Sequence, residues 1–467
     1  MTKKPIGFVL GAGLLAATAS AAAPRTMRID YFHTGNASAE QFSLDRVVLE
    51  RLPWPGNPRR PIDDTNLGKY LFVVHDRATN RPLYSRGFAS IYGEWETTGE
   101  AKTLSRTFSE SLRFPAPEAP VQIVLKKRDA QNAFREIWTF VLDPKDIFID
   151  TSKPSPPGPL LAIQKSGDSA EKVDFLILGD GYTAAERGKF EKDARRLADL
   201  LFAVEPFRSR RNDFSVWGLC PAAEESGISR PSTGIHRRSP LGTTYDAFGS
   251  ERYVLTFENR AFRDIASSAP YEFVEILTNT KTYGGGGIFG LYGTVAADSL
   301  WAPYIFVHEF AHHFAGLADE YFTSAVAYEP AANRVEPWEE NVTTLLDPQA
   351  LKWRDLVSHG TPIPTPWAKE KFEKMSRDYQ KRRREIRAAD GPEEQMDALF
   401  REEQIHETKL LGSDRYSGKV GAFEGAMYEP KGYFRPQEDC IMFTRDEAPF
   451  CAVCRRSLAR VIDLYSR

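Results

Sequence analysis

Short apolar runs separated by turn residues dominate the first 150 residues of the chain. No long helical periodicity accompanies these runs, and pairs such as Pro55-Gly56 mark turns between them. Short β-rich runs at this spacing predict an all-β sandwich, which we expect to span residues 24–150. The runs are Met27–Tyr31, Tyr70–His75, Ala89–Trp95, Val121–Lys126 and Glu136–Leu142.

A different pattern begins after a proline-rich segment. Residues 151–168 contain Pro154, Pro156, Pro157 and Pro159, and we predict that they form a linker. Beyond them, apolar strand-like runs and a helical stretch alternate. This alternation predicts an α/β or α+β domain with a mixed twisted sheet over residues 169–467. The strand-like runs are residues 173–178, 214–219 and 273–278, and the helical stretch is residues 184–203.

Residues 368–410 of the second domain are rich in charge. Phe372, Met375 and Tyr379 recur there at helical spacing, and Gly391-Pro392 interrupts the run. We expect a helical hairpin inserted into the domain, with charged faces in contact with solvent. A partner-binding arm is the alternative interpretation.

The N-terminus has the order of a secretory signal peptide. Lys3 and Lys4 precede an apolar stretch, Ile6–Ala17, which ends in the small residues Ala19–Ala23. The apolar stretch is shorter than the about 20 residues that a spanning helix needs. We therefore predict that residues 1–21 are cleaved, that the protein is secreted or periplasmic, and that no membrane span remains.

Composition narrows the possible partners. The chain has 467 residues, with 61 Lys and Arg against 64 Asp and Glu, which gives a net charge of −3. Because nucleic-acid coating relies on neutralising phosphates with cationic side chains, this balance argues against a nucleic-acid partner.

The four cysteines must be interpreted for an oxidising compartment, where disulfides can form. They are Cys220, Cys440, Cys451 and Cys454. We favour the prediction that Cys440 forms a disulfide with Cys451 or Cys454. Cys451 and Cys454 could also be half of a zinc site, but no second Cys or His pair lies near them in the sequence.

Two glycine-rich segments need separate interpretation. Gly179–Ala184 matches a dinucleotide-binding fingerprint, but no acidic residue follows at a strand end, so a tight strand-to-helix turn capped by Thr183 is favoured. Gly284–Gly287 lacks the ending of a phosphate loop. Its backbone could lie flat and close to another strand or to an extended peptide, or the segment could be a flexible loop, and the local sequence leaves both open.

The clearest chemical signal is an H-E-x-x-H motif within Tyr304–Tyr321. His308 and His312 are four residues apart, so on a helix both imidazoles leave the same face, as two ligands of one tetrahedral ion require. Glu309 lies on the adjacent edge, where it can take a proton from an activated water without coordinating. His313 faces about 100° away and is expected to pack rather than to ligate.

A third ligand must come from Asp319 or Glu320. On an ideal helix Asp319 lies about 20° from the ligand face, whereas Glu320 lies about 120° from it, so Asp319 is favoured. A straight helix would still leave Asp319 about 10 Å from His312. The chain must therefore turn back, and Gly316 is the residue that can end the helix in a left-handed conformation.

At this point the sequence resembles the metzincin metallopeptidases, in which a glycine turns the chain back to present a third ligand. The segment Cys440-Ile441-Met442 resembles their methionine-bearing turn, which implies that Met442 lies beneath the metal.

The chain is more closely similar to the IgA-peptidase family of secreted bacterial metallopeptidases. The matching segments are Leu178–Tyr182, Tyr283–Ile288, His308–Tyr321, Gly421–Gly425 and Cys440–Met442, with Asp30–Gly35 and Gly93–Trp95 in the preceding β-sandwich. The resemblance implies a metzincin-like fold with an active-site helix, a Zn²⁺ cofactor and protein or peptide substrates. It does not carry over an immunoglobulin substrate.

The sequence thus predicts a zinc-dependent endopeptidase. His308, His312 and Asp319 are the predicted metal ligands and Glu309 the catalytic base, while Tyr321, Tyr428 and Arg435 are candidates for stabilising the oxyanion. The alternative is a surface module that binds glycan or protein and holds a structural metal. Glu309 argues against it, because a structural site needs no base.

Overall fold

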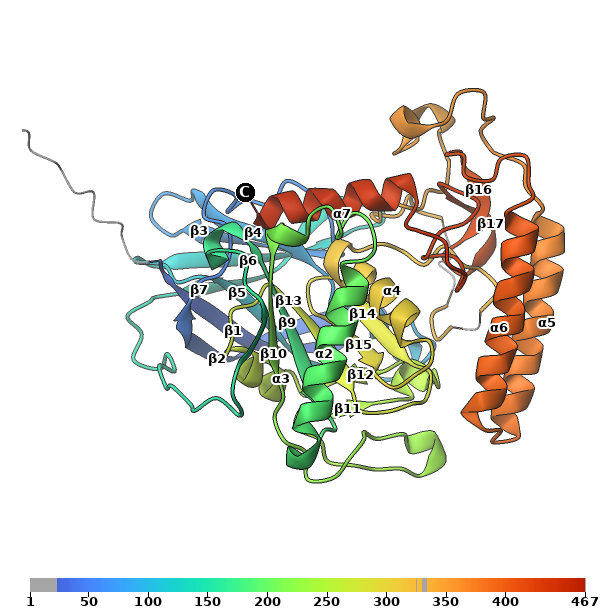
Figure 1. Ribbon diagram of the computed structural model, residues 1–467. Helices are drawn as coiled ribbons and strands as arrows, with labels where there is room; N and C mark the ends of the chain where they lie inside the picture. Colours follow the sequence, from blue (N-terminus) through green and yellow to red (C-terminus); the bar gives the residue numbers. More distant parts are fainter. Residues whose placement is uncertain (1–22, 325, 330–333, 467) are drawn as a thin grey trace, which may run out of the picture.

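The computed structural model describes residues 23–324, 326–329 and 334–466. The predicted signal segment, residues 1–21, lies outside the described residues. Within them the chain is a mixed α/β protein with several sheets and seven α-helices (Figure 1). Two structural parts follow one another along the chain: antiparallel β-sheets come first and a mixed sheet with helices comes second.

The N-terminal part consists of two antiparallel sheets. The first has the strand order β2 (Glu40–Pro53), β1 (Arg25–Gly35), β5 (Arg106–Pro115), and the second has β4 (Pro82–Phe88), β3 (Tyr70–Asp76), β6 (Val121–Arg128), β7 (Phe134–Leu142). Buried side chains from both sheets form one core, which includes Ile29, Tyr31, Phe72, Phe114 and Ile123. Burying one face of each sheet against the other gives the sandwich arrangement.

The expected strand at Ala89–Trp95 is wrong, because residues Ile91–Trp95 form the short helix α1. The Ser90 hydroxyl caps this helix by accepting a hydrogen bond from the Gly93 amide at 3.0 Å. Tyr92 and Trp95 then lie on one side of the helix and pack against Phe108. Nearly every residue of the run is buried, and such a short buried run does not distinguish a strand from a helix by its pattern alone.

The C-terminal part is built on a six-stranded mixed sheet. Its order is β14 (Gly285–Ile288), β15 (Tyr292–Ala296), β13 (Phe273–Thr278), β9 (Val173–Asp180), β10 (Phe214–Leu219), β8 (Leu161–Gln164). The four central strands are parallel and both edge strands are antiparallel to their neighbours. Strand β8 comes from the segment predicted to be a linker. Every residue of β9 is buried, as expected for a central parallel strand.

Helices cover this sheet and extend beyond it (Figure 1). Helices α2 (Arg187–Leu201) and α4 (Ala302–Ala315) contact each other and the sheet, and α7 (Ala452–Tyr465) packs on α4. The charged segment forms the antiparallel pair α5 (Lys369–Ala388) and α6 (Glu393–Leu411), which stands at one end of the molecule. Two smaller hairpins, β11 (Thr243–Thr244) with β12 (Leu255–Thr256) and β16 (Phe423–Ala426) with β17 (Glu429–Arg435), complete the part.

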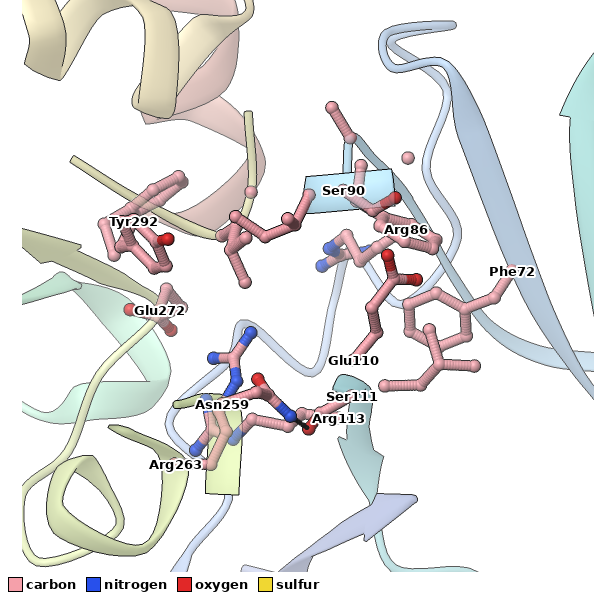
Figure 2. Close-up of a pocket in the computed structure, with 18 of the residues that line it drawn as sticks. Phe72, Arg86, Ser90, Glu110, Ser111, Arg113, Asn259, Arg263, Glu272 and Tyr292 are labelled. Atoms are coloured by element: carbon pink, nitrogen blue, oxygen red, sulfur yellow. Dashed lines mark hydrogen bonds between the residues drawn. The ribbon is translucent and has the colours of Figure 1, made fainter. Parts of the chain in front are cut away.

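Polar and charged side chains fix the two parts against each other. Figure 2 shows a cavity of about 100 Å³ between them, which Arg113 of β5 and Asn259 of α3 (Asn259–Ala266) help to line. The Asn259 amide donates to the Ser111 hydroxyl at 2.8 Å, and Arg113 donates to the Tyr271 carbonyl at 3.0 Å. Because the bonds cross between the two parts, the sandwich is docked in one orientation.

Strand β14 lies directly against helix α4, which decides between the two interpretations of the glycine segment. A Cβ atom added at Gly287 would lie 2.4 Å from the Glu309 carbonyl oxygen and 2.9 Å from the His312 Cβ. A Cβ added at Gly285 would lie 2.6 Å from the Ile305 side chain. Glycine is therefore needed here for close approach between two backbones, not for loop flexibility.

Substituting alanine for Gly287 should destabilise the protein, because either β14 or α4 must move to admit the methyl group. Overpacking of this kind costs about 1–3 kcal/mol of unfolding free energy. Urea unfolding of Gly287→Ala measures the loss. Gly188→Ala is the control, since nothing lies within 4 Å of its added Cβ, which sits on helix α2. That control should keep or slightly raise the stability. Equal stability of Gly287→Ala and wild type would contradict the close approach.

Candidate metal centre

Helix α4 carries the two histidines of the H-E-x-x-H motif. Its apolar residues, such as Phe306 and Phe310, pack on Phe175 of β9, which holds the helix across the sheet. His308 and His312 lie one turn apart on the same face, with ring centroids 4.8 Å apart. The packing of the helix thus fixes the position of both imidazoles.

The helix ends at Gly316, as the sequence predicted. Gly316 adopts φ of 59° and its amide donates to the His312 carbonyl at 2.9 Å. The chain then reverses, and Asn341 holds the returning segment by accepting from the Ala318 amide at 2.8 Å and donating to the Ala318 carbonyl at 2.9 Å. This reversal brings Asp319 back beneath the two histidines.

Three side-chain atoms converge at this point. The Asp319 Oδ1 atom lies 3.0 Å from His308 Nε2 and 3.1 Å from His312 Nε2, and the two Nε2 atoms are 3.1 Å apart. We call these three side chains the histidine group. Glu320 points elsewhere: its Oε1 atom accepts from Asn341 Nδ2 at 3.0 Å. The structure therefore brings together the three residues that the sequence proposed as ligands.

Backbone carbonyls determine which histidine nitrogens face the centre. His308 Nδ1 lies 3.0 Å from the Ile441 carbonyl, and His312 Nδ1 contacts the Leu317 carbonyl. A carbonyl only accepts, so each Nδ1 donates a proton outwards and each Nε2 is turned towards the centre, where its lone pair can bind a cation. Two lone pairs and a carboxylate oxygen at such short range repel one another unless a cation lies between them. The donor set therefore fits a metal ion.

Charge within the histidine group shifts the pKa values of its members. Burial raises the pKa of Asp319, but the two histidines outweigh burial and bring that pKa well below its usual range. Burial lowers the pKa of His312, yet the Asp319 carboxylate outweighs it and raises this pKa to about 9. Both shifts have the same cause, which is the short distance between the Asp319 carboxylate and the two imidazoles.

Glu309 lies beside the histidine group at the floor of a cleft. Burial raises its pKa, although the neighbouring histidines act in the opposite direction. Strand β14 passes over it, since a Cβ at Gly285 would lie 3.1 Å from Glu309 Cγ. Glu309 thus occupies the edge of the helix next to the histidine group and lines the cleft.

The cleft has a volume of about 610 Å³ and draws its walls from both parts of the protein. Gly285 and Gly287 of β14 form one wall beside Glu309, whereas Lys69 and Glu94 come from the N-terminal sandwich. A volume of this size is typical of ligand-binding clefts. The sandwich is therefore part of the cleft rather than a remote appendage.

His313 and Met442 support the centre without entering it. His313 is fully buried, and its Nε2 accepts from the Val274 amide of β13 at 3.0 Å. This matches the packing position that the sequence predicted. Met442 is also fully buried, and its carbonyl accepts from the Glu320 amide at 2.8 Å. Its neighbour Ile441 supplies the carbonyl that orients His308.

The structure gives different environments to the three residues that the sequence suggested for stabilising the oxyanion. Tyr428 donates its hydroxyl to Asp319 Oδ2 at 2.6 Å, and Tyr321 accepts from Arg252 at 3.1 Å at the edge of the cleft. Arg435 is fully buried and donates to the carbonyls of Gly425 and Glu438. Arg435 is therefore structural.

Tyr428 reaches Asp319 because of a strained turn. Met427 and Tyr428 connect β16 to β17 and both adopt positive φ, 49° and 65°. Two-residue hairpin turns with this combination usually contain Asn-Gly or Asp-Gly. The sequence lacks such a pair at this position, so this turn could not be recognised from it. The contact could not be recognised either, because Asp319 and Tyr428 are 109 positions apart in the chain. Strain of this kind collects at functional sites.

Comparison with known families adds to this geometry. Residues 161–462 match a family model described as IgA Peptidase M64, and residues 19–139 match one described as Peptidase M64 N-terminus. No curated protein matches the chain.

Removing the Tyr428 hydroxyl should weaken metal binding by the histidine group. Tyr428→Phe keeps the ring beside Tyr321 but leaves Asp319 Oδ2 without its donor, and loss of such a supporting hydrogen bond costs about 10–100-fold in metal affinity. Dialysis against graded chelator concentrations, followed by metal analysis, measures the affinity. Tyr416→Phe, outside the cleft, is the control. Equal retention in both variants would show that the contact does not support the site.

Proposed function

Since the chain belongs to the IgA peptidase M64 family, we propose that it is a zinc-dependent endopeptidase. The family establishes a metallopeptidase. The observation that supports the finer assignment is the convergence of His308, His312 and Asp319 beside Glu309 at the floor of a large cleft. A histidine-bearing helix that ends in a glycine turn and an acid also supports a metzincin-like arrangement.

The ligand set suits catalytic Zn²⁺. Two imidazole nitrogens and one carboxylate oxygen are common zinc ligands, and three protein ligands leave a fourth position for water or substrate. In this structure the centre opens on the cleft, which His312 and Asp319 both line. When bound, the ion supplies Lewis acidity and lowers the pKa of a coordinated water towards 7.

The side chains around this position have distinct roles in the proposed reaction. Glu309 accepts a proton from the attacking water and passes it to the nitrogen of the leaving amine. Tyr428 holds one Asp319 oxygen, so that the other faces the histidines. Arg252 and Tyr321, joined by a hydrogen bond at the cleft edge, are placed to contact the substrate carbonyl.

Strand β14 offers the substrate a backbone surface. Gly285 and Gly287 line the cleft beside Glu309 and contribute only backbone to this wall. We therefore propose that proteins or peptides bind along this wall, with the sandwich forming the opposite side through Lys69 and Glu94.

We also propose the domain division that the sequence suggested: a sandwich at residues 24–150, a linker at 151–168 and a peptidase domain at 169–467 with the insertion 368–410. The two family models support a division into two domains, because one ends at residue 139 and the other begins at 161. Strand β8 already belongs to the second of them, so the connection between the domains is shorter than the linker that the sequence suggested.

We place the protein outside the cytoplasm, in the secreted or periplasmic fraction. The lysine-rich and apolar N-terminal segment supports this proposal. Among the helices of the described residues, none is long and apolar enough to cross a membrane.

Replacing Glu309 by glutamine should abolish turnover and leave the metal bound. The amide keeps the size of the side chain but cannot take up a proton, and loss of a general base costs about 10²–10⁴-fold in rate. A cleavage-site profile on a denatured proteome, with zinc content measured on the same sample, gives both quantities.

The matched control for this substitution is Glu385→Gln, which changes an exposed glutamate on α5. It should cleave the proteome as wild type does. If Glu309→Gln cleaves as fast as this control, the proposed base is wrong. A wild-type protein that binds zinc and cleaves no protein would instead favour a binding module with a structural metal.

A further inference from the structure

A second group of potential ligands lies next to the histidine group. Glu320, Cys440, Cys451 and Cys454 each place one ligand atom within 4.8 Å of all the others, and we call them the thiol cluster. None of the four residues is more than 2% exposed. The expected disulfide from Cys440 to Cys451 or Cys454 is not formed, since all four cysteines of the chain are free.

The spacing of the cluster fits a tetrahedral ion better than a disulfide. Cys440 Sγ and Cys454 Sγ are 3.9 Å apart, whereas disulfide sulfurs lie about 2.05 Å apart. Two sulfurs at about 2.3 Å from one tetrahedral Zn²⁺ would be about 3.8 Å apart. Glu320 Oε1 lies 3.4 Å from Cys454 Sγ, against about 3.6 Å for an oxygen and a sulfur on the same ion.

Backbone amides point at the sulfurs. The Cys451 amide donates to Cys440 Sγ and the Cys454 amide donates to Cys451 Sγ, both at 3.3 Å. Cys451 is the N-cap of helix α7, so its sulfur also lies at the positive end of that helix. Amide donors and a helix N-terminus stabilise thiolates, which are the form that binds metal.

The cluster holds a polar group that its protein neighbours leave unsatisfied. Glu320 is fully buried, and its Oε2 atom has no hydrogen-bond partner. Such a carboxylate is costly unless something compensates it. A disulfide would use only two of the three sulfurs and would leave Glu320 Oε2 without a partner. One metal ion uses all four groups.

We propose that Cys440, Cys451, Cys454 and Glu320 bind a structural Zn²⁺ ion, separate from the ion of the histidine group. Four protein ligands and complete burial are typical of structural rather than catalytic zinc sites. Sulfur ligands in tetrahedral array also favour zinc over magnesium or calcium. The buried Arg435 guanidinium interacts electrostatically with Glu320 and Cys440, which offsets the negative charge of the ligands.

The ion joins three segments that support the cleft. Glu320 follows Asp319 in the chain, Cys440 precedes the Ile441 carbonyl that orients His308, and Cys451 begins helix α7. The proposed ion therefore holds together the segments that position Asp319 and His308. This inference does not rest on the proposed peptidase activity, because the ligands belong to a different group.

The full-length variant His308→Ala/His312→Ala, loaded with zinc alone, tests the site. Its histidine group cannot bind, so the thiol cluster holds whatever metal remains. We expect one zinc per chain against two in wild type, and X-ray absorption with three sulfur neighbours and one oxygen neighbour. A zinc-free variant, or zinc surrounded only by nitrogen and oxygen, would overturn the proposal.

Thiol counting provides an independent measurement on the wild-type protein. The protein is denatured with chelator, without reductant, and alkylated before mass analysis. Four alkylated cysteines are expected if the cluster holds a metal. A pair of cysteines that resists alkylation and is linked in peptide mapping would instead establish the disulfide and refute the metal site.

A cysteine outside the cluster provides the matched control. Cys451→Ser should lose one zinc per chain, and Glu320→Gln should bind zinc more weakly, whereas Cys220→Ser should keep two. Full zinc content in Cys451→Ser would remove this residue from the ligand set and overturn the proposal. If Cys451→Ser does not fold, the absorption and alkylation measurements decide the question.

Discussion

The left-handed turn at Gly316 is the constraint on which the whole centre depends. Without it, helix α4 would carry Asp319 away from the histidines; with it, the chain doubles back under them. A side chain at this position would meet the ring of Trp338. Glycine is therefore required here for two reasons, the lack of space and the positive φ. Asn341 then anchors the returning segment through both polar groups of Ala318.

The returning segment serves two neighbouring groups because its successive acids, Asp319 and Glu320, contact different partners. Asp319 turns towards the histidines, whereas Glu320 turns towards the cysteines and Asn341. The Glu320 amide also donates to the Met442 carbonyl, so the segment that carries Cys440 is held against this returning segment. One short stretch of backbone thus organises both sides of the centre.

Sequence reasoning succeeded where the relevant interactions are local. The i, i+4 spacing of His308 and His312 and the helix-ending glycine are readable within one helix and its turn. It failed at Ala89–Trp95, where an apolar run was taken for a strand. It proposed Tyr428 for the oxyanion but missed the contact of Tyr428 with Asp319, which lies 109 positions earlier in the chain. The thiol cluster was equally hidden, because its fourth member, Glu320, lies far from the cysteines in sequence.

The docked sandwich has a consequence for how selectivity could change over evolution. Arg46 of β2 bonds to Asp264 of the peptidase part at 2.8 Å, and Arg113 bonds to the Tyr271 carbonyl, so the wall carrying Lys69 and Glu94 is rigidly placed. The part of the cleft wall that belongs to the sandwich is therefore encoded in a different stretch of the gene from the histidine group and Glu309. Substitutions in the stretch that encodes the sandwich can change this wall of the cleft and leave the histidine group and Glu309 unchanged.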